Sequence, residues 1–305
     1  MHLDPSQLSR AKKLFVLGKS TDMLFTALEG LGVELGVRWR AADHGGNLSQ
    51  SLSQYVERIR VLSGAISYTS NRFTDILFRQ QEIDWKKEVL AYVPKSDVFD
   101  QASDPKASSW RMFMGLSIKD FHVDIVSLMD ALAPVLIQTE SKLKPKDVNR
   151  LPGWATIQRG TKCSYRKELS HDLCKIIDGT DRWWPSVKEV RNLLTHRKHD
   201  RIIFGNSEDG LLFQIYDQTM RPSIELPSVL YRKEKYVVDF DFYSAFIFAE
   251  LIILFDEIGN AIASKLGITR NNLAQMCQRE VVKSVAKSIE RLIQATEKLL
   301  SRVGP

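Results

Sequence analysis

The residues best suited to chemistry lie close together in one short segment, at Arg191, Asn192 and His196. Histidine has an unperturbed pKa of about 6.5, so it can remove or return a proton near neutral pH. Arginine stays charged, and its planar guanidinium matches the oxygens of a phosphate group. The neighbouring asparagine can orient the arginine or hold a phosphate oxygen. These residue types therefore favour chemistry at a phosphate group.

The segment 191–196 (RNLLTH) resembles the motif of the HEPN superfamily, which has an arginine, a polar residue and, after a short spacer, a histidine. The resemblance rests on these residues and on their place at the end of a predicted helix. As architecture it extends over 108–305. It implies an all-α helical bundle that forms a homodimer and acts as a metal-independent endoribonuclease, in the manner of a toxin or an antiviral effector.

For RNA, the resemblance implies that the 2′-hydroxyl attacks the adjacent phosphorus and leaves a 2′,3′-cyclic phosphate and a 5′-hydroxyl end. His196 would remove the hydroxyl proton, Arg191 would stabilise the negative charge on phosphorus, and Asn192 would support Arg191. No metal and no cofactor is expected. Two alternatives stay open: a non-catalytic HEPN-like module that binds RNA or a nucleotide, and a helical interaction protein in which the motif is accidental.

The spacing of Arg191 and His196 sets a geometric condition. On a continuous helix, residues five apart are separated by about 140° around the axis and by about 7.5 Å along it. The two side chains therefore converge only if the helix ends near His196 or if a second protomer supplies one of them. A strand-like segment at 201–204 predicts an end there. His199, about 80° from Arg191 on a continued helix, is the competing histidine.

Other charged residues follow the motif or are expected to approach it. Arg197, Lys198 and Arg201 could contact the RNA backbone, and a solvated charged face is the ordinary alternative. Asp120 and Asp124 lie four apart on one face of a predicted helix. The resemblance implies an acidic or polar residue on another helix near the arginine, and either aspartate could be that residue. An ordinary exposed face is the alternative for this pair as well.

Three further residues, Glu250, Trp183 and Trp184, are expected to be buried. Glu250 interrupts the most apolar stretch of the chain, at 242–255, so we expect it to be buried and paired, with a basic residue near the motif as its candidate partner. A structural ion pair is favoured over a catalytic role. Trp183 and Trp184 are expected to anchor the core, with base stacking as the alternative.

The composition is that of a globular protein, with 44% hydrophobic and 26% charged residues among 305. The net charge of +6 favours an anionic partner, with nucleic acid first, and a mildly basic protein without such a partner is the alternative. The N-terminus has no apolar signal core, and the most apolar stretch is shorter than the about 20 residues of a membrane span. Three cysteines indicate a reducing compartment. We therefore expect a cytoplasmic protein without membrane contact, with an antitoxin or other regulatory protein as a further candidate partner.

The hydrophobic pattern divides the chain into an N-terminal helical region at 1–107 and a helical bundle at 108–305, which the resemblance implies is of the HEPN type. A polar segment at 95–108 marks the boundary. Short alternating segments predict two or three strands at about 200–240, as a small β insertion in the bundle. The predicted helices cover the ranges 5–18, 48–92, 110–139, 165–177, 185–197, 242–265 and 280–302.

Overall fold

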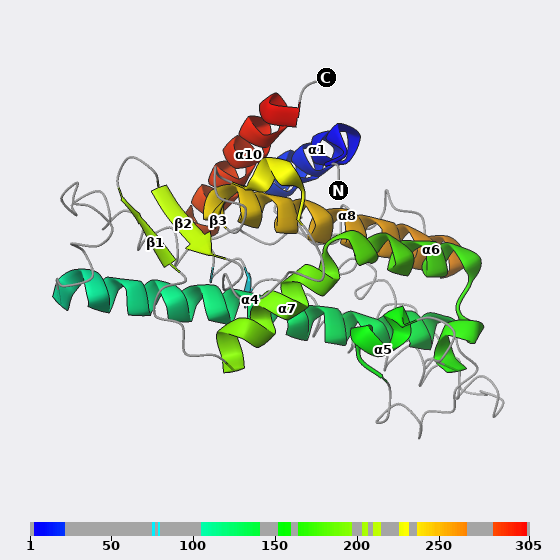
Figure 1. Ribbon diagram of the computed structural model, residues 1–305. Helices are drawn as coiled ribbons and strands as arrows, with labels where there is room; N and C mark the ends of the chain where they lie inside the picture. Colours follow the sequence, from blue (N-terminus) through cyan, green and yellow to red (C-terminus); the bar gives the residue numbers. More distant parts are fainter. Residues whose placement is uncertain are drawn as a thin grey trace.

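The computed structural model is predominantly helical, which confirms the prediction of an all-α protein (Figure 1). It describes residues 3–21, 75–76, 79, 105–140, 152–159, 164–196, 203–206, 210–214, 226–231, 237–266 and 283–303. Most of the predicted helix at 48–92 lies outside these ranges.

Helix α8 (Phe240–Leu266) is the central element of the fold. Every residue at 242–256 is buried, and a helix that is apolar on nearly all sides belongs in a core. Asp239 caps its first turn, because the Asp239 Oδ1 accepts from the backbone N–H of Asp241 at 2.9 Å and of Phe242 at 3.4 Å. The apolar stretch found in the sequence is therefore the axis around which the other helices pack.

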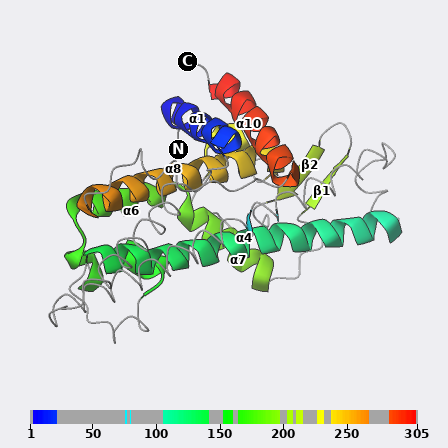
Figure 2. The ribbon, with the colours of Figure 1, turned by 180° about the vertical axis from the view of Figure 1, so that it is seen from behind.

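Helices α1 (Pro5–Thr21) and α10 (Lys283–Val303) lie side by side against α8 (Figures 1 and 2). Asp4 precedes a proline at the first helical position, and its Oδ1 accepts from the backbone N–H of Ser6 at 2.9 Å, a favourable helix start. Arg10 of α1 bonds Asp256 at 2.5 Å and Glu257 at 2.9 Å on α8.

The N-terminal helix thus belongs to the same core as the C-terminal helices. Leu8 and Ala11 of α1 are buried in one hydrophobic cluster with Leu292 and Leu299 of α10. The predicted division at residue 107 leaves α1 outside the bundle and falls within the first turn of α4 (Pro105–Glu140). The contacts of α1 correct that division for this helix.

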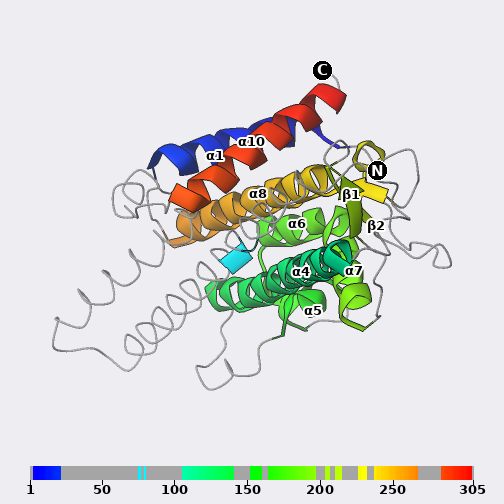
Figure 3. The same cartoon turned by 90° about the vertical axis from the view of Figure 1, so that its left-hand side faces the viewer.

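A second layer contains α4, α5 (Trp154–Gln158), α6 (His171–Gly179) and α7 (Trp184–His196), with α6 nearest to α8 (Figure 3). Phe121 of α4 joins this layer to α8, since its ring centroid lies 5.8 Å from those of Phe240 and Phe248. The predicted helix at 165–177 is divided in the structure. A 3₁₀ turn at Ser164–Glu168 is followed by α6, whose N-cap is Ser170.

Three short strands form a small antiparallel sheet in the order β1-β2-β3. They are β1 (Ile203–Asn206), β2 (Gly210–Gln214) and β3 (Val237–Asp239), all within the range of the predicted insertion. The sheet contacts α4 through β1 and α8 through β2 and β3. It therefore lies between the two longest helices of the described chain, beside the N-terminus of α8.

Candidate functional site

Helix α7 carries the Arg191, Asn192 and His196 motif and is held against α4 by an apolar face. That face includes buried Val187, Val190 and Leu193. Trp183 and Trp184 at its start are each 1% exposed, which confirms their prediction as core anchors. The firmly packed N-terminal half of α7 therefore positions a C-terminal half that reaches solvent.

The three motif residues lie on the solvent side of α7. Arg191 is half-buried, whereas Asn192 and His196 are exposed, and His196 is the last residue of the helix. By helical geometry, Asn192 lies about 100° from Arg191, between it and His196. Within the described part of the chain, Arg191 and His196 make no hydrogen bond with each other. One protomer thus presents Arg191 and His196 at separate positions on the solvent side of α7 and not as a joined pair.

The hydrogen bond that the structure gives Arg191 involves its backbone and not its side chain. Its carbonyl oxygen accepts from Thr195 Oγ1 at 2.7 Å. Its Nε is buried and has no hydrogen-bond partner among the described residues. A buried N–H without an acceptor is costly, so an acceptor that reaches this edge of α7 would be favoured.

The acidic residues expected near the motif differ from each other. Asp120 is half-buried, whereas Asp124 is 9% exposed and forms an ion pair with Arg79 Nε at 3.4 Å. The alternative of an ordinary exposed face is therefore wrong for Asp124. Both lie on α4, the helix that packs against α7. Arg197, Lys198, His199 and Arg201 lie outside the described residues.

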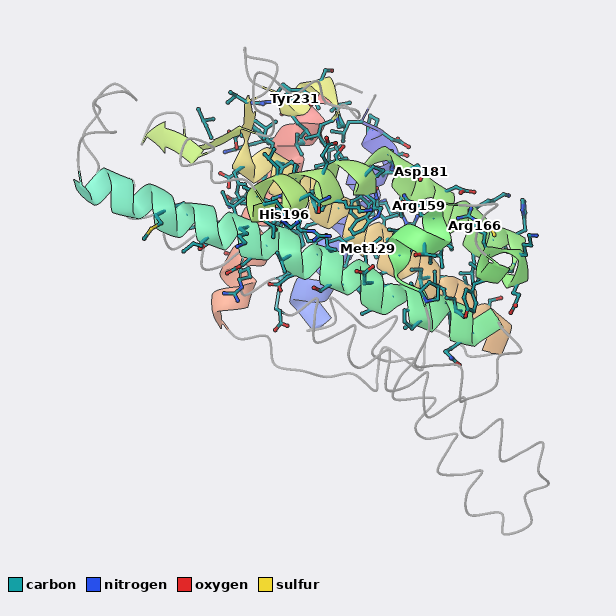
Figure 4. All side chains as sticks on the ribbon, turned by 60° about the horizontal axis from the view of Figure 1, so that its bottom comes forward. Met129, Arg159, Arg166, Asp181, His196 and Tyr231 are labelled. Carbon is teal, nitrogen blue, oxygen red and sulfur yellow. The ribbon has the colours of Figure 1, made fainter. Side chains whose placement is uncertain are left out.

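A hollow of about 230 Å³ lies between α5 and α7 and includes one motif residue, Asn192. Arg159 and Lys188 bring positive charge to its lining, and Glu189 brings negative charge. Figure 4 shows Arg159 away from His196, on the side where Arg166 and Asp181 lie. The sequence analysis missed this hollow, because none of the predicted helices covers 141–162; Trp154 was the one signal of a buried anchor there.

Helix α5 is short and is fixed by side chains from other elements. Asp130 of α4 accepts from the backbone N–H of Trp154 at 2.9 Å. Gly153 permits this approach, since a Cβ there would lie 2.5 Å from Asp130 Oδ1. Arg166 donates to the Ile157 carbonyl at 3.1 Å and pairs with Asp178 of α6. These contacts connect α5 to both α4 and α6, so the wall of the hollow is well anchored.

A second, larger pocket of about 510 Å³ lies between α1, α6 and α8. Glu250 of α8 lines it and accepts two hydrogen bonds from Arg182, at 3.0 Å from Nε and 2.6 Å from Nη2. This confirms that Glu250 is buried and paired with a basic residue, but the partner precedes α7 and does not lie near the motif, where it had been expected. Burial raises the pKa of Glu250 to about 7; Arg182 opposes the shift, and Glu257 and Asp4 add to it.

A buried histidine lies between α4 and α8. His122 Nδ1 is 2.7 Å from the Ile118 carbonyl oxygen and Nε2 is 2.8 Å from the Tyr243 hydroxyl. Because a carbonyl only accepts, Nδ1 carries the proton and Nε2 accepts from Tyr243. Burial lowers the pKa of His122 to about 4, so it is neutral at pH 7 and joins the two helices as a structural group.

No family model, curated protein or solved structure matches this chain. Among the described helices, none combines the length and the apolar composition that a bilayer crossing requires.

Proposed function

We propose that this chain is a metal-independent endoribonuclease of the HEPN type, in which Arg191 and His196 act on an RNA phosphate with the support of Asn192. The observation that carries the proposal is the common location of these side chains on the solvent side of α7, with His196 at the helix end. His196 removes the 2′-hydroxyl proton and Arg191 stabilises the charge on phosphorus. The products are a 2′,3′-cyclic phosphate and a 5′-hydroxyl end.

The active unit in this proposal is a homodimer. Arg191 and His196 are about 140° apart on their helix, so a guanidinium and an imidazole from different protomers can meet at one phosphate more readily than two from the same helix. The exposed pair Met112 and Leu116 supports pairing of two copies, because these side chains are 60% and 49% exposed and lie one turn apart on α4. RNA is the substrate, the compartment is the cytoplasm, and an antitoxin or regulatory protein restrains the activity.

Cleavage of a synthetic RNA by the purified chain, in the presence of a chelator, tests the chemistry. We expect His196→Ala and Arg191→Ala each to lower the cleavage rate by about 10²–10⁴-fold, the usual contribution of a positioned acid–base or charge-stabilising group. His171→Ala is the matched control, since His171 is an exposed histidine on α6. Full activity of both motif variants would overturn the proposal.

Mixing the two inactive variants tests the dimer. If the site combines Arg191 of one protomer with His196 of the other, a mixture of Arg191→Ala and His196→Ala contains dimers with one intact site and regains activity. No recovery in a mixture shown to exchange subunits would place both residues of a site in one protomer.

Leu116→Glu should lower the molar mass measured by light scattering if the exposed face of α4 forms the dimer contact.

A non-catalytic module that binds RNA or a nucleotide is the second candidate. The angular separation of Arg191 and His196 favours it, because a binding surface needs no convergence of the two side chains. Under this alternative the wild type retains RNA without cleaving it, and Arg191→Ala weakens RNA binding in a filter or fluorescence titration. Arg191→Ala thus distinguishes the two functions, because it lowers the cleavage rate if the chain is a nuclease and the affinity for RNA if the chain is a binding module.

A further inference from the structure

The hollow between α5 and α7 is lined by unpaired cations from both helices. Arg159, directly after α5, and Lys188 of α7 line it, and neither side chain has an ion pair or a hydrogen bond within the described part of the chain. Glu189 is the one carboxyl group among the described lining residues, and it takes part in another interaction. The lining thus carries positive charge that the protein leaves uncompensated, which favours an anion.

A buried donor in the same lining lacks an acceptor. Trp184 lines the hollow although it is only 1% exposed, so it contributes a buried part of the wall. Its Nε1 has no hydrogen-bond partner among the described residues, whereas the Nε1 of Trp154 donates to Thr180 Oγ1 at 3.3 Å. An indole N–H can only donate, and leaving it buried without an acceptor costs free energy. An anion in the hollow would supply the missing acceptor.

The hollow is continuous with the motif along α7. Four residues of this helix, each four positions after the previous one, form a single ridge on its surface: Trp184, Lys188, Asn192 and His196. Each lies about 6 Å further along the axis than the previous one and about 40° further around it, so Lys188 is about 12 Å from His196 along the axis. Arg159 also lies away from His196 (Figure 4). An anion in the hollow is therefore separate from one at the histidine but lies on the same ridge.

We propose that the hollow binds a second phosphate group of the RNA, on the strand whose first phosphate meets the motif. The inference rests on the proposed function, which supplies RNA as the ligand. Arg159 and Lys188 pair with the phosphate oxygens, and Trp184 donates to one of them. The volume of about 230 Å³ is below the range usual for a complete small-molecule ligand, so the hollow fits one group of a longer chain. The second phosphate fixes the register of the strand relative to His196.

Fluorescence titration of the full chain with a short single-stranded RNA tests the proposal. Its riboses carry 2′-O-methyl groups, so no 2′-hydroxyl can attack and binding is measured without cleavage. We expect Lys188→Gln and Arg159→Gln each to weaken binding at least about threefold and to lower the slope of log affinity against log salt by about 0.7, the value of one phosphate contact on a single strand. Lys175→Gln is the matched control, since Lys175 is exposed and lines the separate pocket between α1, α6 and α8. Wild-type affinity and slope in both hollow variants would overturn the proposal.

The indole N–H resonance of Trp184 in NMR spectra reports whether the phosphate reaches the hollow. It should shift when this RNA is added, whereas the resonance of Trp154, which already donates to Thr180, should stay nearly in place. Inorganic phosphate alone should cause the same shift only at a far higher concentration, because it lacks the neighbouring phosphate at the motif. A Trp184 resonance that stays in place at saturating RNA would refute the site, and one that shifts with inorganic phosphate but not with RNA would make it a site for a free anion instead.

Two outcomes separate the phosphate site from the nuclease activity. If the wild type binds the modified RNA through the hollow but cleaves no unmodified RNA, the phosphate site stands and the nuclease is refuted. If the wild type cleaves unmodified RNA and neither Lys188→Gln nor Arg159→Gln loses affinity, the nuclease stands and the phosphate site is refuted.

Discussion

Two polar regions lie at opposite ends of α7 and are built in opposite ways. Arg182, just before the helix begins, donates twice to a buried carboxylate on α8. Asn192 and His196, toward its other end, are exposed, and His196 makes no hydrogen bond among the described residues. Both regions contain an arginine and a titratable side chain. Only the Arg182–Glu250 pair is held in place by buried contacts.

The difference separates stability from function. Removing one partner of a buried pair leaves an uncompensated group and costs folding free energy, whereas exposed charges contribute little to folding. Residues that the fold does not need are free to meet a substrate. The motif region is therefore where substitutions should change activity alone, and the Arg182–Glu250 region is where they should change stability first.

The largest expected effect is a loss of activity at the motif without a loss of stability. His196→Ala should lower RNA cleavage by about 10²–10⁴-fold while the free energy of unfolding changes by less than about 0.5 kcal/mol, as for most surface substitutions. Chemical denaturation and a cleavage assay on the same preparation measure both quantities. A loss of activity accompanied by a large loss of stability would show that His196 belongs to the folded framework.

The next effect comes from two buried titratable groups with a shifted pKa, Glu250 and His122, which have opposite pH dependence. The pKa of Glu250 is raised from 4.5 to about 7, so its contribution to stability is complete below pH 4.5 and is lost as pH rises through 7. The pKa of His122 is lowered from 6.5 to about 4, so its contribution is complete above pH 6.5 and is lost as pH falls through 4. Between these limits the two slopes oppose each other.

Substituting one of the two groups should reveal the dependence of stability on pH that the other group contributes. In Glu250→Gln the His122 contribution remains, and stability should fall as pH falls from 6.5 to 4.5. In His122→Gln the Glu250 contribution remains, and stability should fall as pH rises over the same window. At about 1.4 kcal/mol per pH unit, each change amounts to about 2–3 kcal/mol. Denaturant unfolding across this pH range is the measurement, and identical profiles in both variants would contradict the assignment.

Arg182→Ala should cost less, about 2 kcal/mol, because Arg182 is a third exposed and Glu250 can take up a proton when its partner is lost. Arg191→Ala is the matched arginine-to-alanine variant at the motif, where the half-buried side chain has no ion pair among the described residues, and it should change stability by less than about 1 kcal/mol. Thermal unfolding of the two variants compares the regions directly. Equal losses would remove the distinction drawn between them.

The long helices could be predicted from the sequence because their signals are local. Asp4 and Asp239 cap the starts of α1 and α8, and the apolar stretch at 242–255 identifies the central helix. The partner of Glu250 was predicted only as a basic residue, since choosing Arg182 requires knowing how α6 and α7 cross α8. Pairings across 68 residues of chain leave no local pattern to recognise.

The candidate site shows the same limit. Helix α7 follows from periodicity and its end near His196 from the strand-like segment at 201–204, but the hollow beside Asn192 depends on α5, a short helix held by Asp130 from 24 residues away. The break between 165 and 177 was missed because Tyr165 and Leu173 fit one apolar periodicity. Ser170 interrupts the predicted helix because it caps the start of α6. A serine inside an apolar periodic segment gives no clear signal of this role.

The smallest expected effect sharpens the comparison on the pocket side. Ser170 Oγ accepts from the backbone N–H of Leu173 at 3.4 Å and caps α6, which carries Asp172 and Lys175 at the pocket. Ser170→Ala should lower the free energy of unfolding by about 1 kcal/mol, the usual value of an N-cap. Ser301→Ala is the control, because Ser301 is exposed near the end of α10 and donates to the Lys298 carbonyl instead of capping a helix start. RNA cleavage by Ser170→Ala should stay at the wild-type rate, since α7 packs mainly against α4. A parallel loss of cleavage would show that the two ends of α7 are coupled through α6.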